Sequence, residues 1–383
     1  MKGLIVWAYS NCRSVMAFYR AFAFELNVPL MVCLLHYEEN RTMLADRVQV
    51  GFRADEFDDV EMICVGNNFA VGLRVLDEHP GWHHLFTSYQ ESAAFRRLIQ
   101  VAHARGEAVA IGSEAPCNME TGLRGWLKKI YFRTYLPWKV RKVIPLADFF
   151  LNYSGSDFSR AEAIGWPRAK IIPFGYFPPP IEGSTCRLRT SNKPFHILST
   201  GVLSRYRGAD ILLEALILLK ARGVPYRATI TQKGELFDAL RGKIAAYDLP
   251  VEMVGFVSME ELIRLYETCS VFVGAGRDEP WGMRLNDALN CAAPLVVNRG
   301  MGGAALVDEY ACGLTFTTAA ELADCLEKLA RDEKLYAECA AHAVQAARNI
   351  SPRVQAKRVV EAIRGLGWDC DLRRDWFAWL GGF

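Results

Sequence analysis

Hydrophobic residues fall in short, continuous runs separated by longer amphipathic stretches. Unbroken hydrophobicity indicates strands covered on both faces, as in a parallel sheet. Helical periodicity between the runs, as at 15–26 and 91–106, predicts βαβ units and therefore a doubly wound α/β domain. The strand-like runs of the first half lie at 3–9, 29–37, 60–66, 83–90, 107–115, 147–154 and 169–176.

The alternation of strand-like and helical stretches stops after residue 176 and resumes at residue 195. Residues 177–194 are rich in Pro, Ser, Thr and charge and lack periodicity, which predicts a linker. We therefore expect one domain over 1–177, a second over 190–350, and a terminal segment, 351–383, that packs back on the first domain. After the linker, strand-like runs lie at 195–201, 226–234, 251–257, 270–276 and 294–300, with helical patterns at 209–223 and 319–349.

Composition narrows the class of protein. The 383 residues are 51% hydrophobic, enough for well-buried cores, and a net charge of +2 argues against a nucleic-acid partner. No window approaches the ~20 apolar residues of a membrane span, and the N-terminal run predicts a strand rather than a signal peptide. Eleven cysteines lie scattered without C-x-x-C spacing, which suits free thiols in a reducing compartment. We expect a cytoplasmic protein.

The stretch SVFVGAGRDEPWGMRLNDALNCAAPLVV carries the first chemical signal. It predicts a buried strand, a glycine-containing loop and a helix that begins near Gly282. Free N–H groups of Gly282, Met283 and Arg284 at such a helix start favour an anion. Glu279 before the helix and Asp287 within it can accept hydrogen bonds from hydroxyls, so a phosphorylated, polyhydroxylated ligand fits. The alternative is a Glu279 that caps its helix and an exposed Asp287.

The stretch LSTGVLSRYRGADILLEAL carries the second signal. A strand ends at Gly201, a turn holds Arg205 and Arg207, and a helix follows Gly208. Two guanidinium groups can hold a diphosphate through charge-assisted hydrogen bonds. The alternative is a pair of solvated loop arginines.

Together these stretches resemble the retaining GT-B transferases of glycosyltransferase family four, which carry G-R-L-x-x-x-K-G and later E-P-F-G-x-x-x-x-E. Here the two motifs read GVLSRYRG and EPWGMRLND at matching spacing. The resemblance covers about residues 147–350. It implies a GT-B fold, in which two doubly wound Rossmann-like domains face a central cleft, the first binding the acceptor and the second the nucleotide sugar.

The resemblance also implies roles for residues. Glu279 would hold hydroxyls of the donor sugar, and Asp287 those of the ribose. Arg207 would replace the family's lysine on the diphosphate, while the backbone near Gly255 and Phe256 would face the nucleobase. The sugar would be transferred with retention, without an enzyme nucleophile, a cofactor or a metal.

The chain departs from the family at three places. Val202 replaces the arginine of G-R-L, and Arg205 is a candidate substitute. The loop after the first strand reads SNCRS where the family often has Gly-Gly. Where the family often has a histidine, this chain has GSEA, so Glu114 becomes a candidate for contact with the acceptor or the donor sugar. The alternative is that Glu114 is an ordinary loop carboxylate.

Two further segments have open interpretations. Residues 123–142 hold seven basic residues and no acid, with apolar residues at helical spacing and an interruption at Pro137. This segment can lie on an anionic membrane, near a lipid-linked acceptor at the inner face of the plasma membrane, or pack its apolar side on its own domain. Asp369 and Asp371 resemble a metal-binding D-x-D, although a charged tail is the plainer interpretation.

The sequence thus predicts a metal-independent hexosyl- or glycosyltransferase that moves a sugar from a nucleotide sugar to a glycan or lipid-linked acceptor, in synthesis of a bacterial surface polysaccharide or glycolipid. Its predicted catalytic residues are Glu279, Arg207 and Glu114. Two alternatives are a sugar-nucleotide epimerase on the same fold and a non-catalytic sugar-nucleotide-binding protein.

Overall fold

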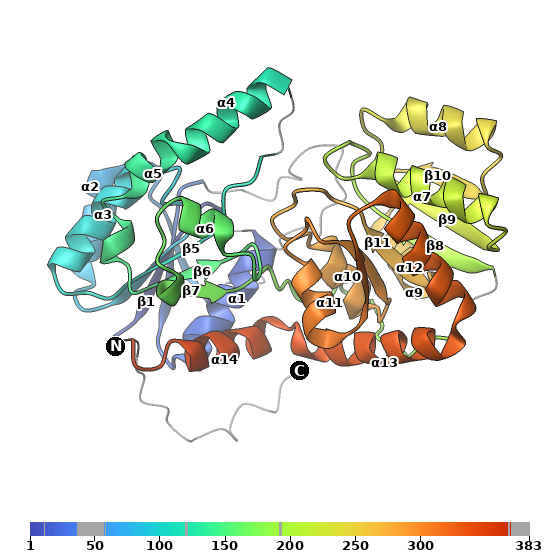
Figure 1. The fold of residues 1–383 in the computed structure, drawn as a ribbon. Helices are drawn as coiled ribbons and strands as arrows, with labels where there is room; N and C mark the ends of the chain where they lie inside the picture. Colours follow the sequence, from blue (N-terminus) through green and yellow to red (C-terminus); the bar gives the residue numbers. More distant parts are fainter. Residues whose placement is uncertain are drawn as a thin grey trace.

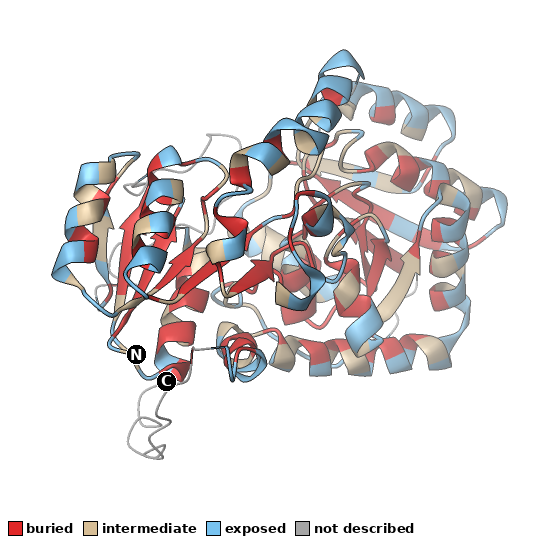
Figure 2. Ribbon diagram, turned by 60° about the vertical axis from the view of Figure 1, so that its left-hand side comes forward, coloured by how far each residue is buried: buried red, intermediate tan, exposed pale blue. Residues whose placement is uncertain are grey.

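The computed structural model describes residues 1–10, 12–36, 57, 59–118, 122–190, 194–366 and 368. It contains two α/β units side by side, each built on one parallel sheet (Figure 1). The central strands of each sheet are buried and the outer faces of the helices are exposed, as Figure 2 shows. This arrangement confirms the predicted pair of doubly wound α/β units.

The first sheet has the strand order β3-β2-β1-β4-β5-β6-β7. All its neighbouring strands are parallel, in agreement with the continuous hydrophobic runs. The order reverses between β1 and β4, and ligands of open α/β sheets bind beyond the carboxyl ends of strands at such a point. The strands are β1 (Leu4–Ala8), β2 (Leu30–Leu34), β3 (Glu61–Cys64), β4 (His83–Phe86), β5 (Val109–Ser113), β6 (Phe149–Asn152) and β7 (Ile171–Pro173).

The second sheet has the order β10-β9-β8-β11-β12-β13, which repeats the first without its last strand. Its neighbouring strands are also parallel, and the corresponding reversal lies between β8 and β11. The strands are β8 (Phe195–Ser199), β9 (Tyr226–Thr231), β10 (Val251–Gly255), β11 (Val271–Gly274), β12 (Leu295–Asn298) and β13 (Gly313–Phe316).

Helices cover both faces of each sheet. In the first unit, side chains on one face of β1 pack against α1, and those on the other face pack against α2 and α3. In the second unit, α7 and α12 cover one face and α9, α10 and α13 the other. The helices are α1 (Arg13–Glu25), α2 (Phe69–Glu78), α3 (Ala93–Ala104), α4 (Gly122–Arg133), α5 (Tyr135–Val140), α6 (Ser159–Ala163), α7 (Ala209–Ala221), α8 (Phe237–Ala246), α9 (Met259–Thr268), α10 (Arg284–Asn290), α11 (Ala304–Tyr310), α12 (Ala319–Arg331), α13 (Glu333–Asn349) and α14 (Pro352–Ala362).

The chain crosses between the units twice. After β7 it passes through a segment without helix or strand in its described part, where the Arg189 guanidinium donates to the carbonyl oxygens of Tyr266, Cys269 and Cys291. The second crossing follows α13, and α14 packs against α1 of the first unit. The indole of Trp368 donates a hydrogen bond of 3.1 Å to Asp148, which anchors the chain's return to the first sheet.

Two helical patterns are divided in the structure. The pattern over 319–349 breaks at Asp332, whose backbone is extended and whose carboxylate accepts from the N–H of Leu335 at 2.9 Å, capping α13. The pattern over 123–142 breaks at Thr134. This break lies three residues before the interruption expected at Pro137. Pro137 still explains it, because a proline has no N–H to donate to the carbonyl four residues before it, and that carbonyl belongs to Arg133, the last residue of α4.

Candidate functional site

A cleft of about 880 Å³ lies between the two units. Its first-unit wall includes residues that follow β1, β4 and β5, where the carboxyl ends of the strands meet the strand-order reversal. Its second-unit wall is formed by the turn after β8 and by the loop between β11 and α10. The cleft lining includes Ser10, Cys12, Ser14, Glu91, Glu114, Tyr176, Tyr206, Arg207, Glu279, Gly282 and Met283.

Glu279 lies at the base of the second-unit wall and is only 6% exposed. Two arginines from different segments contact its carboxylate: Nη1 of Arg207 donates to Oε1, and Nη2 of Arg284 donates to Oε2 at 3.0 Å. A buried carboxylate needs such charged partners, because burial without them is costly. The structure therefore brings together Glu279 and Arg207, which are 72 positions apart in the sequence.

Arg284 occupies an unexpected place. Only its backbone N–H figured in the sequence-based prediction, but its guanidinium also reaches back to donate to the carbonyl oxygen of Thr200 at the end of β8. A Cβ placed on Gly201 would lie 2.0 Å from Nη1 of Arg284. This guanidinium thus lies against the backbone one residue before Val202, beside Arg207 and Glu279.

Arg205 faces a different environment. Arg205 is exposed and does not line the cleft. Its backbone N–H donates to Glu235 at 3.1 Å, and its carbonyl oxygen accepts from Arg277. The structure therefore does not place Arg205 with Arg207 and Glu279.

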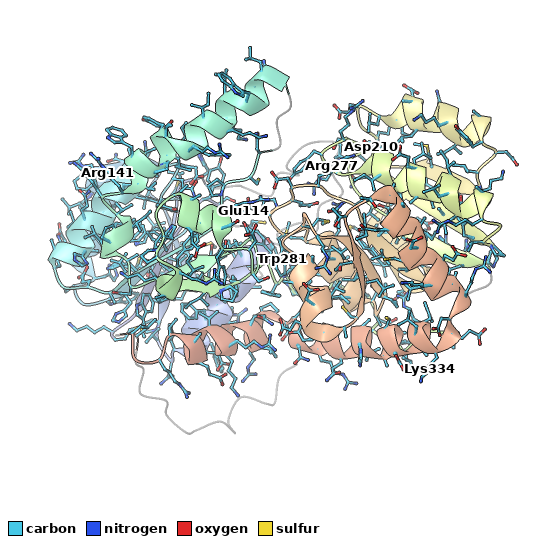
Figure 3. The ribbon with its side chains drawn as sticks, viewed as in Figure 1. Glu114, Arg141, Asp210, Arg277, Trp281 and Lys334 are labelled. Atoms are coloured by element: carbon cyan, nitrogen blue, oxygen red, sulfur yellow. The ribbon has the colours of Figure 1, made fainter. Side chains whose placement is uncertain are left out.

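Glycines allow the loops of this wall to approach one another. Gly208 has φ +71, and a Cβ there would lie 1.9 Å from the carbonyl oxygen of Ala275. Gly282 has φ +96, and its Cβ would lie 2.4 Å from Cε of Met301. A side chain at either position would be strained by the positive φ, and at Gly208 it would also collide with backbone, so Gly208 needs glycine on both grounds. Arg277 forms a bidentate ion pair with Asp210 of α7, at 2.7 and 2.8 Å (Figure 3). This pair joins the loop after β11, which contains Ala275, to the start of α7 beside Gly208.

The helix after the cleft loop is short and begins close to the predicted start. It begins at Arg284, two residues after Gly282, and spans seven residues. Asp287 is on this helix, outside the cleft lining. Burial raises the pKa of Asp287 to about 7, and the nearby charge of Arg284 partly opposes that rise. A carboxyl group in this state can either accept or donate a hydrogen bond near neutral pH.

Gly255 and Phe256 lie apart from these groups. Gly255 ends β10, has φ +68 and lies near Lys233, while the Phe256 ring is 44% exposed. Neither residue lines the cleft. Their position at the carboxyl edge of the second sheet is compatible with a contact to one end of an extended ligand, and the nucleobase contact stays a prediction.

Glu114 projects from the first unit, directly after β5, and Figure 3 shows it on the side that faces Trp281 of the second unit. The side chain is reached by solvent through the cleft, yet the surrounding walls desolvate its carboxylate and raise its pKa. A hydrogen bond from Tyr176 and the charge of Arg207 oppose that rise, and the charge of Glu91 adds to it. Glu91 also has a raised pKa, because burial disfavours its charged form.

The loop that replaces Gly-Gly also borders the cleft. Ser10, Cys12 and Ser14 line it at the start of α1, and Asn11 lies outside the described residues. Cys12 and Ser14 have their Sγ and Oγ atoms 3.2 Å apart. Hydroxyl and thiol side chains therefore stand where a bare glycine backbone was the expected family feature.

Contacts between the units adjoin Glu279. Its neighbour Asp278 forms an ion pair with Arg160 of α6 and accepts from the backbone N–H of Asn118 at 3.1 Å. Trp281 packs against Phe177, with ring centroids 5.3 Å apart. The stretch SVFVGAGRDEPWGMRLNDALNCAAPLVV contained Asp278 and Trp281 but gave no sign of these partners, which come from the other unit.

Within the described ranges, no three His, Cys, Asp or Glu side chains are grouped as metal ligands. Asp369 and Asp371 lie outside those ranges. Among the helices of the described chain, none has the length and hydropathy needed to cross a bilayer.

The second half of the chain is similar in sequence to known glycosyltransferases. Residues 187–346 match the model of the family described as glycosyl transferases group 1. The chain is 29% identical over 162 residues to the amylovoran biosynthesis glycosyltransferase AmsK of Erwinia amylovora. That match covers 39% of this chain and 39% of the relative, so the chain spans well under half of the curated relative's length.

Solved structures resemble the whole chain. Alr3699/HepE of Anabaena in complex with UDP has a TM-score of 0.64 at 15% identity, covering 95% of this chain and 99% of that one. The lipopolysaccharide outer core galactosyltransferase WaaB, in its apo form, has a TM-score of 0.66 at 12% identity, with coverage of 95% and 99%. These likenesses establish the fold: two Rossmann-like domains arranged as in GT-B glycosyltransferases.

Proposed function

We propose that this chain is a retaining glycosyltransferase that moves a sugar from a nucleoside-diphosphate sugar to a glycan or lipid-linked acceptor, in synthesis of a bacterial surface polysaccharide or glycolipid. The observation that carries the proposal is the buried carboxylate of Glu279, held between Arg207 and Arg284 at the base of the cleft. The group 1 match over the second domain supports it. The polysaccharide and lipopolysaccharide roles named for AmsK and WaaB support the pathway.

The donor half of the site has the groups that this reaction needs. Each guanidinium has five N–H donors, so Arg207 and Arg284 can contact Glu279 and a diphosphate at the same time. Glu279 then accepts hydrogen bonds from hydroxyls of the donor sugar. In this scheme Arg284, rather than Arg205, supplies the positive charge absent at Val202, because its guanidinium lies beside Arg207 and that of Arg205 does not.

The reaction breaks the bond between the anomeric carbon and the diphosphate oxygen. The acceptor hydroxyl oxygen forms the new bond on the same face, and its proton passes to a donor phosphate oxygen. The diphosphate leaves with developing negative charge, which preorganised guanidinium groups stabilise. No metal is needed in this scheme. Glu114, across the cleft, accepts a hydrogen bond from the acceptor or the donor sugar and holds it over the anomeric carbon.

The site can be tested by Glu279→Gln, which keeps the size of the side chain and removes its charge. We expect kcat to fall about 10²–10³-fold, with a milder change in nucleoside-diphosphate affinity, because the hydroxyls of the sugar lose their charged acceptor while Arg207 and Arg284 remain to bind the diphosphate. Glu338→Gln, at an exposed position of α13, is the matched control. Unchanged turnover in Glu279→Gln contradicts the proposed sugar site.

The donor can be identified by thermal shift with nucleoside diphosphates and their sugars, because a ligand that binds only the native state raises Tm. With a donor in hand, product should form only when an acceptor is present. Conversion of the donor sugar without any acceptor would indicate an epimerase instead. Tight donor binding with no turnover on any acceptor would indicate a non-catalytic binding protein.

A further inference from the structure

Trp281 packs across the boundary between the two units. It follows Glu279 by two residues in the cleft loop and is only 3% exposed. Its indole N–H donates a hydrogen bond of 2.8 Å to Oδ1 of Asn286, a buried residue of α10. That bond orients the ring from within the second unit. It also occupies the one polar group of the side chain, so Trp281 lines the cleft without a donor to spare for a ligand.

The far edge of the Trp281 ring lies against the first unit. A Cβ placed on Gly175 would lie 2.5 Å from Cζ2 of this ring, closer than side chains approach one another. The backbone of Gly175 does not have a positive φ, so the ring, rather than the backbone conformation, excludes a larger residue there. Phe177 packs edge-on against the same indole, with ring centroids 5.3 Å apart. Residues 175–177 therefore hold the Trp281 ring in a close-packed contact.

The same first-unit segment supports Glu114. Tyr176 is the middle residue of 175–177, and its hydroxyl donates a hydrogen bond to the Glu114 carboxylate. Burial and the charge of Glu114 raise the pKa of the Tyr176 hydroxyl, so the phenol keeps the proton that it donates. The Tyr176 ring packs in turn against Tyr153, with centroids 5.2 Å apart. A shift of this segment would therefore move the hydrogen-bond partner of Glu114.

Glu279 lies between two contacts with the first unit. On one side, Asp278 pairs with Arg160 and accepts from the N–H of Asn118. On the other side, Trp281 packs on 175–177. Long charged side chains can follow a small shift by rotating about their bonds, whereas a ring packed against a glycine backbone transmits it. The Trp281 contact is therefore the stiffer of the two.

We propose that Trp281 is a positioning residue for the transfer reaction: its ring sets the position of Glu279, on the donor side of the cleft, relative to Glu114 on the opposite wall. Figure 3 shows Trp281 and Glu114 on facing sides of the boundary between the units. Trp281 acts through the cleft loop on one side and through 175–177 on the other. This role rests on the proposed function, in which Glu279 holds the donor sugar and Glu114 holds a substrate over the anomeric carbon.

Positioning and binding have different kinetic consequences. Reacting atoms must come within about 3–3.5 Å of one another, and a displacement of about 1 Å can lower a rate about 100-fold. The guanidinium groups of Arg207 and Arg284 are held by Glu279 and by the Thr200 carbonyl, all within the second unit. A disturbed Trp281 contact should therefore lower kcat while the affinity for the diphosphate stays nearly the same.

Gly175→Ala tests this role, because it adds one methyl group where the Trp281 ring lies. We expect kcat for transfer to fall about 100-fold. The Kd of the nucleoside diphosphate, measured by calorimetry with whichever of UDP, GDP or ADP raises Tm, should change little. A fall in kcat matched by an equal loss of this affinity would overturn the proposal, since it would assign Trp281 to donor binding.

Gly3→Ala is the matched control. A Cβ on Gly3 would lie 2.5 Å from Cε2 of Trp82, the same separation from a tryptophan ring as at Gly175, and φ is not positive there either. Gly3 and Trp82 precede β1 and β4, at the amino ends of the strands, whereas the cleft adjoins their carboxyl ends. Both variants should lower the midpoint of urea unfolding, but Gly3→Ala should keep the kcat of the parent.

A second substitution tests the contact itself. Trp281→Phe removes Cζ2, Cη2 and Cζ3, the ring atoms that the new methyl group would meet. Compared with Trp281→Phe alone, the double variant with Gly175→Ala should lose little further kcat. The same 100-fold loss in both backgrounds would show that Gly175→Ala acts without the Trp281 ring, and the proposal would be wrong.

Amide hydrogen exchange gives a readout that needs no substrate. The N–H of Asn118 donates to Asp278 across the boundary between the units, at 3.1 Å. In Gly175→Ala the peptide that contains Asn118 should exchange faster than in the parent, and in Gly3→Ala it should not. Unchanged exchange in Gly175→Ala would mean that the two units keep their relative position, which contradicts the proposed role.

These measurements separate the role of Trp281 from the proposed function. A parent that transfers no sugar removes the transferase, while faster exchange in Gly175→Ala still supports Trp281 as the residue that sets the relative position of the two walls. A parent that transfers sugar, with kcat unchanged in Gly175→Ala, overturns the role of Trp281 and leaves the transferase.

Discussion

The two units repeat one strand order but form their walls of the cleft differently, the second mainly with closely packed backbone and the first mainly with side chains. In the second unit the backbone dominates: Gly208 lets its loop approach the Ala275 carbonyl to a distance that no side chain permits, and Gly282 has a positive φ that favours glycine. In the first unit side chains dominate, with Glu91, Glu114 and Tyr176 lining the cleft. The fold is shared, while the way each unit offers chemical groups to the cleft is not.

This difference explains why sequence comparison matches the second unit while the first is matched only in structure. A wall built on close backbone approach tolerates few substitutions, so it leaves fixed glycines at fixed spacing. A wall built on side chains can change with its ligand and leaves no such spacing. The family match accordingly covers 187–346, in the second unit and its linker, whereas structural similarity extends over both units.

The largest effect is expected from adding one methyl group to the backbone-built wall. Gly208→Ala should cost about 3–4 kcal/mol of unfolding free energy, because the new Cβ meets the Ala275 carbonyl and the backbone has φ +71. Gly223 has φ +66 but open space around it, so Gly223→Ala should cost only about 1 kcal/mol. Gly66, in the first unit with φ +58 and open space, should behave like Gly223. Urea titration measures all three, and equal losses would remove the contrast between the walls.

Removing the arginines of the second-unit wall should have the next largest effect. Arg207→Ala and Arg284→Ala should each weaken nucleoside-diphosphate binding by about 1.5–3 kcal/mol, the usual loss for a charge-assisted hydrogen bond. Arg205→Ala is the control, since Arg205 is exposed and lies outside the cluster of Arg207, Arg284 and Glu279, and it should change the affinity little. Calorimetry that finds the larger loss in Arg205→Ala would reverse the assignment.

A smaller, pH-dependent effect is expected in the first unit. The pKa of Glu114 is raised in the folded protein, so the native state holds this proton more tightly than the unfolded chain does. Stability must then fall as the pH rises from the unfolded pKa of about 4.3 through the raised value. Glu114→Gln removes this loss, so its Tm should slightly exceed that of the parent at pH 8 and match it at pH 4. The exposed control Glu338→Gln should show no such divergence, and a Glu114→Gln curve parallel to the parent's at every pH would contradict the expectation.

The smallest effect is expected from metal removal. Since guanidinium groups can neutralise the departing diphosphate, transfer activity should be unchanged by a chelator. Loss of activity on chelation, with recovery on adding Mg²⁺, would show that Arg207 and Arg284 do not by themselves neutralise the departing diphosphate.

Several features could be predicted from particular residues, and others could not. The continuous apolar runs predicted the parallel strands, and the spacing within EPWGMRLND singled out Glu279 and Asp287. Arg284 was named only for its backbone, because no local pattern reports that a side chain turns back across β8. Tyr176 and Arg160 went unnoticed for the same reason: each gains its partner only when distant segments meet.

The sequence by itself determined the two doubly wound units and the glycine-spaced loops of the second, because hydrophobic periodicity and backbone freedom are local properties. Tertiary structure alone decided which arginines join Glu279, which side chains of the first unit oppose it, and that the apolar side of α4, with Leu123, Trp126 and Leu127, faces solvent rather than its own domain. Those outcomes depend on how separate elements pack in space, and a stripe of apolar residues reads the same in sequence whether it faces a core or solvent.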